Sequence, residues 1–234
     1  MNTKLFVLGL IFFFTGTQLL IAQKNQIRDV SAFSEISLKV DANVHLKQGS
    51  TQLIELNGRA TTLEKLVTEV KERKLVIRYQ NESKFSKWKP GPVDIYVTMP
   101  QVDALVVSGS GSIVSEGIIE SRILDLIISG SGNIKLGDLK SEKVSAKVSG
   151  SGNLSLSGTK LAAELKALIS GSGNLKAIDF PTDNVDMKVS GSGNCWVNAS
   201  KKLVANLLGS GNVIYRGNPA VETTILGSGK VKEE

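Results

Sequence analysis

From about residue 101 onward, apolar and polar residues alternate in short runs, and each run stops at a glycine-rich corner. The run Leu124–Ile128 reads Leu-Asp-Leu-Ile-Ile and the run Val144–Val148 reads Val-Ser-Ala-Lys-Val, so every second side chain is apolar. This period of two is typical of a strand with one buried face, whereas an amphipathic helix repeats every three to four residues. The pattern therefore predicts β-strands that turn their apolar faces toward a common core.

The corners recur at a nearly constant spacing. Their first glycines are separated by 21, 20, 21, 20, 18 and 18 residues and stand at Gly109, Gly130, Gly150, Gly171, Gly191, Gly209 and Gly227. A flexible Gly-Ser linker has no reason to keep such a period. A unit of this length cannot bury its apolar stripe alone, but stacked copies can share one. The sequence thus predicts an all-β fold, a parallel β-helix (solenoid) with about 18–21 residues per coil and GSG(N) corners.

The repeat also predicts a register. We align the coils on the apolar residue before each corner, which gives an inward column of Val107, Ile128, Val148, Ile169, Val189, Leu208 and Leu226. Both glycines of a corner are expected to supply the positive φ angle that a sharp bend requires. The residues after the corners, Asn133, Asn153, Asn174, Asn194 and Asn212, are expected to stack as an amide ladder.

One column that this alignment turns outward is more apolar than an exposed face should be. It contains two lysines, and its five aliphatic members are Val106, Ile127, Leu168, Leu207 and Ile225. Contiguous apolar surface on a soluble protein usually meets another surface. Either the N-terminal segment or a long loop covers this column, or the column is an interface for a partner or a second copy of the chain.

The N-terminal third lacks the corner motif, but its apolar residues still alternate or form short runs, as in strands. We interpret residues 30–100 as irregular N-terminal coils and a cap, and residues 101–231 as the regular coils of the same single domain, which spans 23–234. Ala60–Val67 is expected to form a short helix. The expected strands are Ile36–Val40, Val44–Lys47, Leu53–Leu56, Leu75–Tyr79 and Val93–Val97.

The first 22 residues have the composition of a secretory signal peptide. One lysine precedes an apolar run from Leu5 to Ala22, and cleavage is expected near Ala22–Gln23. The alternative is an uncleaved anchor, although the run is at the short end for a spanning helix. No later segment is apolar enough to span a bilayer as a helix, so we expect an exported protein in the periplasm, at the cell surface or secreted.

Charge and cysteine content add little to this interpretation. The formal net charge is +6, and the one dense basic cluster, Lys84–Lys89, is more typical of a solvated loop than of a site for an anionic surface. We expect no nucleic-acid partner for an exported chain. Cys195 is the only cysteine, so the fold has no intramolecular disulfide and must depend on a regular core.

The sequence contains few groups that suggest catalysis. The glycine corners lie between strands, whereas phosphate-binding loops precede a helix, so no nucleotide cofactor is expected. The single histidine, His45, is expected to face solvent, and Cys195 is expected to be buried in the core. Neither a Ser-His relay nor a His and Cys metal site can be assembled from these residues, so the sequence assigns no catalytic, cofactor-binding or metal-binding residue.

Carboxylates are the remaining candidates, because some parallel β-helices act on polysaccharides. Asp125 and Asp186 occupy the same outward position of the repeat in different coils. At a spacing of ~4.8 Å per coil they would lie about 14 Å apart. Paired glycosidase carboxylates lie about 5–9.5 Å apart. The acids Asp138, Asp179 and Asp183 fall in the variable connections, where isolated carboxylates are usually solvated.

The assembled features resemble the head GIN domain family of autotransporter adhesins, which are exported proteins of the Bacteroidetes type. The resemblance is carried by the SGSGN series, by the segment Val30–Ile36, by Val44–Gly49, which ends in Gln-Gly, and by the strand Lys74–Ile77. It implies a right-handed β-helix akin to pectin-lyase-like proteins and a role in cell adhesion, with no catalytic residues. We therefore expect a non-catalytic protein that binds a cell-surface, glycan or protein ligand at the cell envelope. The alternatives are a polysaccharide-active enzyme and a self-associating envelope scaffold.

Overall fold

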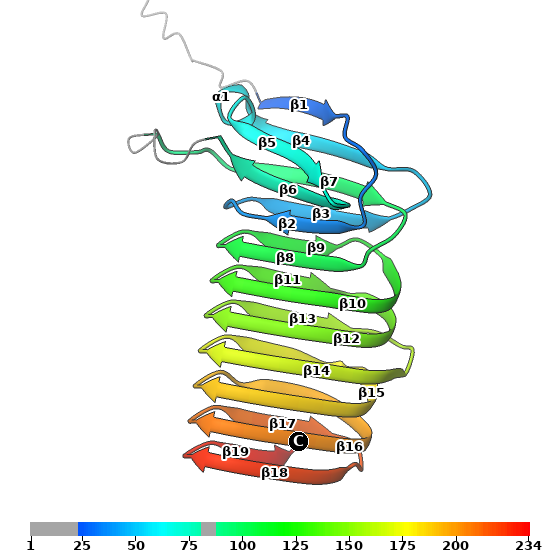
Figure 1. The fold of residues 1–234 in the computed structure, drawn as a ribbon, viewed down its shortest axis with the longest axis vertical. Coiled ribbons are helices and arrows are strands. Elements are labelled where there is room, and N and C mark those ends of the chain that lie inside the picture. The colour runs from blue at the N-terminus through cyan, green and yellow to red at the C-terminus, as the bar shows by residue number, and fades with distance from the viewer. Residues whose placement is uncertain (1–22, 81–87) are drawn as a thin grey trace, which may run out of the picture.

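The computed structural model describes residues 23–80 and 88–234. The expected signal peptide, residues 1–22, and residues 84–87 of the basic cluster lie outside the described residues. Figure 1 shows two extended faces of strands stacked along one long axis, with the N-terminal elements at one end and the C-terminus at the other. Within the described part of the chain, no helix has the length and apolarity that crossing a bilayer requires.

The regular coils form two parallel sheets that share one core. In the front sheet of Figure 1, consecutive coils contribute β8, β10, β12, β14, β15, β16 and β18, and in the back sheet they contribute β9, β11, β13, β15, β16, β17 and β19. Front strands run toward the GSG corners and back strands run away from them as the chain descends, which makes the solenoid right-handed. The predicted right-handed parallel β-helix is confirmed. The bounds are β8 Ala104–Gly109, β9 Ser112–Ser115, β10 Ile118–Gly130, β11 Asn133–Leu136, β12 Asp138–Gly150, β13 Asn153–Ser157, β14 Ala162–Gly171, β15 Asn174–Gly191, β16 Cys195–Gly209, β17 Asn212–Arg216, β18 Ala220–Gly227 and β19 Lys230–Glu233.

The predicted register is right for five coils and wrong for the last two. Val189 pairs with Leu207, Gly191 with Gly209, and Leu207 with Ile225. Leu208 and Leu226 therefore occupy the position that serine holds in the other coils, and both are exposed. The inward column is Val107, Ile128, Val148, Ile169, Val189, Leu207 and Ile225. The glycines fix the register, and a leucine directly before a corner does not have to point inward.

The two glycines of a corner have different roles, which corrects the expectation that both adopt positive φ. Gly150, the first glycine, has a φ of 115°, a conformation that only glycine adopts without steric cost. Gly152, the second glycine, is buried, and a Cβ there would lie 2.4 Å from the carbonyl oxygen of Gly132 and 2.5 Å from Ile128 Cγ2. Successive corners therefore stack backbone on backbone. The amides of Ser151 and Gly152 both donate to the carbonyl of Gly130, at 2.9 and 3.0 Å.

The asparagine ladder is present. Asn153 Nδ2 donates to Asn133 Oδ1 at 3.0 Å, and Asn174 Nδ2 donates to Asn153 Oδ1 at 2.9 Å. Asn212 Nδ2 donates to Asn194 Oδ1 at 2.9 Å. Only the step between Asn174 and Asn194 differs, because there the backbone amide of Asn194 donates to Asn174 Oδ1. The ladder thus ties five corners together at the surface.

The N-terminal coils are stacked out of sequence order. β2 (Glu35–Leu38) pairs in parallel with β8 on one side and with β6 (Lys74–Tyr79) on the other. β3 (Asn43–Gln48) lies in the same way between β9 and β7 (Val93–Met99). The chain therefore lays down the β2–β3 coil, leaves it to build the β6–β7 coil, and passes back to continue at β8. Irregular earlier coils were expected, but this order was not.

A cap of antiparallel strands closes the N-terminal end. β4 (Leu53–Arg59) pairs with β7, β1 (Gln23–Arg28) pairs with β4, and β5 (Leu66–Lys71) pairs with β6. The helix α1, Ala60–Leu63, lies between β4 and β5. It is shorter than the expected Ala60–Val67 because Leu66 and Val67 enter β5 and pair with β6.

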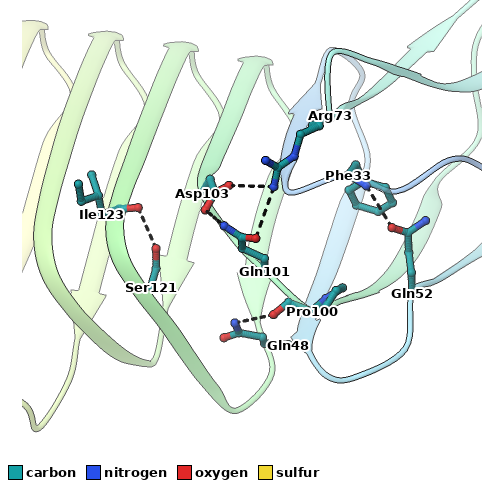
Figure 2. Close-up of polar contacts among 9 residues, drawn as sticks. All are labelled: Phe33, Gln48, Gln52, Arg73, Pro100, Gln101, Asp103, Ser121 and Ile123. Atoms are coloured by element: carbon teal, nitrogen blue, oxygen red, sulfur yellow. Dashed lines mark hydrogen bonds and ion pairs between the residues drawn. The ribbon is translucent and has the colours of Figure 1, made fainter.

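Side-chain hydrogen bonds fasten the out-of-order coil (Figure 2). Arg73, in the β5–β6 turn, reaches Gln101 and Asp103, which precede β8, at 3.4 and 3.6 Å. Gln48, at the end of β3, donates to the carbonyls of Pro100 and Glu120 at 3.0 and 3.1 Å and accepts from the Glu120 amide at 2.6 Å. These contacts join segments that the chain order separates.

Candidate binding surface

The outward side of the back sheet carries one continuous column of residues, here called the back column. Strand register places its members side by side across successive coils: Tyr96, His45, Val114, Lys135, Ser155, Lys176, Trp196, Ile214 and Lys232. The column contains three lysines and three aromatic rings but no carboxylate. Within residues 23–80 and 88–234, no carboxylate forms an ion pair with Lys135, Lys176 or Lys232.

An irregularity in β15 shapes the surface beside Trp196. Ala177 pairs with Val197 and Pro181 with Asn198, so the three residues between Ala177 and Pro181 oppose no residue of β16. Phe180 turns inward and is fully buried, whereas Ile178 is half-buried and Asp179 is exposed. A bulge of this kind redirects side chains and recurs near binding sites.

The bulge and Trp196 border a hollow of about 370 Å³ on the back sheet. Its apolar parts are the half-buried Trp196 and Ile178, and its polar parts include Lys176, Ser157 and Asp179. These residues come from three successive coils. An apolar area with a few convergent polar groups is typical of a ligand site.

A second hollow, of about 490 Å³, adjoins the first and shares Ser157, Ile178 and Asp179 with it. It adds the amide of Asn198 and the guanidinium of Arg216. Arg216 lies 3.7 Å from the Asp179 carboxylate, and its Nε donates to Glu234 at 2.7 Å. The two hollows together form one groove on the back sheet, here called the Trp196 groove.

The front sheet carries a different hollow, of about 500 Å³. Three lysines from three coils border it, together with Leu168 and Asp186, and these are Lys147, Lys166 and Lys188. Lys166 lies 3.0 Å from Glu164, and this ion pair raises the pKa of Lys166 and lowers that of Glu164. Among the described residues, none that borders the front hollow is aromatic.

The structure breaks up the apolar outward column that the sequence suggested. Leu207 is 1% exposed and belongs to the core, and Ile225 is its inward neighbour in the last coil. Val106, Ile127 and Leu168 do point outward, but Lys147 separates Ile127 from Leu168. The predicted outward column is therefore wrong at Leu207 and Ile225, because the register of the last two coils differs by one residue from the alignment on which it was based. An interface at Val106, Ile127 and Leu168 stays a prediction.

The other residues singled out from the sequence lie in separate places. Cys195 is buried, as expected, and burial raises the pKa of its thiol to about 12. His45 lies on the outward face, also as expected, where its ring stacks on Tyr96 at 4.7 Å and its Nδ1 lies 3.2 Å from Glu116.

Of the candidate carboxylates, Asp138 and Asp179 both border the second hollow on the back sheet, whereas Asp125, Asp183 and Asp186 border neither hollow of the Trp196 groove. Ser145 and Lys166 separate Asp125 from Asp186 in the strand register. The Lys201 ammonium and the Ser200 hydroxyl, both at 2.7 Å, hold the pKa of Asp183 below its usual value. Among the described residues, no three His, Cys, Asp or Glu side chains lie close enough together to hold a metal ion.

The sequence interpretation missed Trp196 as a candidate binding residue. The alternation of Cys195, Trp196 and Val197 places Trp196 on the outward face, but its surroundings depend on the bulge. The available signal was the coil length, because 20 residues separate Gly171 from Gly191 and only 18 separate Gly191 from Gly209. The extra residues of the longer coil are those that border the groove.

Comparison with known proteins identifies related folds. A family model described as "Putative auto-transporter adhesin, head GIN domain" matches residues 32–219. No curated protein matches the chain.

Several solved structures share the fold at low sequence identity. A putative adhesin from Bacteroides fragilis superposes with a TM-score of 0.81 and 22% identity, over 91% of this chain and 97% of that one. A putative lipid binding protein from Parabacteroides distasonis gives a TM-score of 0.73 and 21% identity, over 91% and 96%. A putative adhesin from Parabacteroides merdae gives the same TM-score, identity and coverage.

Proposed function

Because the chain belongs to the head GIN domain family of putative auto-transporter adhesins, we propose that it is a non-catalytic binding protein of the bacterial cell envelope that mediates adhesion. It is exported through its N-terminal leader and presents the sides of the solenoid to its ligand. Neighbours of the same fold named as adhesins support this role.

The observation that carries the proposal is the construction of the lateral surface. Its hollows are lined by side chains from three or more successive coils, on strands that are hydrogen-bonded on both sides. A site built on such elements is held in place before the ligand arrives, which lowers the entropic cost of binding. A surface that repeats along the axis also suits a ligand that is long or repetitive.

The distribution of carboxylates supports a role in binding over polysaccharide cleavage. Acid–base hydrolysis of a glycan requires two carboxyl groups that face one bond, about 5–9.5 Å apart. Here, two of the candidate acids pair with basic side chains, Asp183 with Lys201 and Asp179 with Arg216.

The proposal is tested with protein recovered after export of the full chain. Its mass should show cleavage after Ala22. Beads coated with it should attach to bacterial cells or to extracellular matrix more than beads coated with an unrelated exported protein. Attachment at the control level on every surface would overturn the adhesive role, and release of new reducing ends from an acidic polysaccharide would overturn the non-catalytic one.

A further inference from the structure

The most informative feature of the back column is the combination of its rings and its charges. Trp196 stands directly between Lys176 and Ile214 in the strand register. A half-buried indole offers an apolar face and a polar edge to a ligand. The C–H face of a pyranose ring is apolar, and its hydroxyl groups lie around its edge, so a sugar matches both parts of the surface around Trp196.

The polar groups around Trp196 fit the hydroxyl groups of a sugar. Ser157 and Asn198 can both donate and accept, the Asp179 carboxylate accepts, and the Arg216 guanidinium donates. Arg216 is held by Asp179 and Glu234, so its position is fixed from two sides.

The lysines of the back column point to a ligand with negative charge. Lys135 and Lys176 stand two coils apart, which is about 10 Å on the ~4.8 Å spacing of strands. Lys232 lies on the opposite side of Trp196 from Lys176, and these two lysines are three coils apart. Exposed lysines without a carboxylate partner are available to pair with the carboxylates of a uronic acid. The spacing of about 10 Å between Lys135 and Lys176 is comparable with the disaccharide repeat of a 1,4-linked chain.

From these observations we propose that the Trp196 groove and the back column bind an acidic polysaccharide that contains uronic acids, with the chain running along the solenoid axis. Trp196 stacks on one sugar ring, and Lys176 and Lys135 pair with carboxylates on one side of it. This inference rests on the proposed binding function and names the ligand class and the site.

The experiment uses Trp196 as its own reporter. The chain has two tryptophans, and Trp88 lies near the other end of the molecule, edge-on to Tyr79. In the variant Trp88→Phe, Trp196 is the only indole, so a change in emission reports on the groove. The probes are a β-1,4-mannuronate hexamer and β-1,4-mannohexaose, which differ only in whether C6 is a carboxylate.

The expected result is a saturable change in emission with the mannuronate hexamer, and binding at least about tenfold weaker with mannohexaose. In the Trp88→Phe background, Lys176→Ala should weaken binding of the charged hexamer about threefold and reduce its dependence on salt. The matched control is Lys39→Ala, which removes an exposed lysine that borders none of the three hollows and should leave the affinity unchanged. Calorimetry in the wild-type background should show that Trp196→Ala weakens binding at least about tenfold, with an unchanged melting temperature.

Each other outcome overturns a defined part of the proposal. No change in emission with either hexamer shows that Trp196 does not bind these glycans. Equal affinity for the two hexamers, with no effect of Lys176→Ala, removes the acidic specificity. If Trp196→Ala beads still attach to cells as well as wild-type beads, the glycan site fails while the adhesive function stands. If the hexamer binds but wild-type beads do not attach, the adhesive function fails while the site stands.

Discussion

The regular coils and the N-terminal coils have the same two-sheet cross-section but reach it differently. From β8 onward, each strand pairs with its equivalent in the next coil of the sequence, and the same corner recurs each time. At the N-terminal end, the β2–β3 coil is placed between β8–β9 and a coil that the chain builds later. Strand pairing holds both regions. Packing between corners adds to it in the first region, whereas side chains such as Gln48 and Arg73 add to it in the second.

The difference shows what a sequence repeat contributes. In the regular coils, each GSG corner packs on the equivalent corner of the preceding coil. The same backbone geometry therefore recurs from coil to coil. In the N-terminal coils, no two steps are alike, and each depends on its own contacts. The regular region should therefore be more sensitive to changes at corners, and the N-terminal region more sensitive to changes in individual polar side chains.

The largest expected effect comes from a corner glycine. Gly152→Ala places a Cβ 2.4 Å from the backbone of Gly132, so we expect the free energy of unfolding to fall by about 3 kcal/mol or more. Gly137→Ala is the matched control in the same stack, because nothing lies within 4 Å of its Cβ position. Gly49→Ala, whose Cβ would lie 3.1 Å from the Thr98 methyl group, should cost about 1 kcal/mol. Urea denaturation of the three variants measures this order, and equal losses would show that the corners are not closely packed.

The next effect compares the middle of the stack with its C-terminal end. Leu165 is fully buried, so Leu165→Ala should cost about 3 kcal/mol. Ile225 belongs to an inward column but is 40% exposed in the last coil, so Ile225→Ala should cost less than about 1 kcal/mol. Thermal unfolding of both variants is the measurement. A loss at Ile225 as large as at Leu165 would mean that another surface covers the last coil in solution.

A smaller effect depends on pH and on the burial of Cys195. Burial raises the pKa of Cys195 from 9.0 to about 12, so the unfolded chain loses this proton first as the pH rises. The contribution of the neutral thiol is complete below pH 9 and is lost between pH 9 and about 12, by at most about 1.4 kcal/mol per pH unit. Cys195→Ala lacks this slope, so the difference between wild type and variant should shrink from pH 8.5 to pH 10.5. A constant difference would show that the thiol ionises normally and is not sealed in the core.

The smallest expected effect is local to the N-terminal coils. Gln48→Ala removes the side-chain contacts to Pro100 and Glu120 and should cost about 1 kcal/mol. Hydrogen exchange should become faster in β2, β3 and the segment that precedes β8, and remain unchanged in β12 to β16. The control is Gln80→Ala, at the exposed residue that directly follows β6. Uniformly faster exchange would show that the two regions unfold as one unit and are not fastened separately.

The sequence predicted the regular coils because their physics is local and repeated. Alternation identified the strands, the glycine spacing gave the coil length, and the asparagines predicted the ladder. The alignment was wrong where a leucine replaced serine before the corner, at Leu208 and Leu226. Hydrophobicity alone places such a leucine inside, but the backbone contacts of the corner glycines fix the register.

Neither the stacking order of the N-terminal coils nor the Trp196 groove could be predicted from alternation and glycine spacing. Pairing of β2 with both β6 and β8 depends on contacts between residues far apart in the sequence, and no repeat marks them. The groove depends on the bulge in β15, which buries Phe180 and turns Ile178 and Asp179 beside Trp196. The difference in coil length indicated an irregularity but not which side chains it would expose.

The most direct test of binding at the back sheet is a residue-resolved nuclear magnetic resonance titration with the mannuronate hexamer. The proposed site predicts that amide shifts cluster around Lys176, Ile178, Trp196 and Asn198, extend along the back column toward Lys135, and leave the front-sheet lysines Lys147, Lys166 and Lys188 unchanged. Shifts centred on the front sheet, or no shifts at saturating concentration, would contradict it.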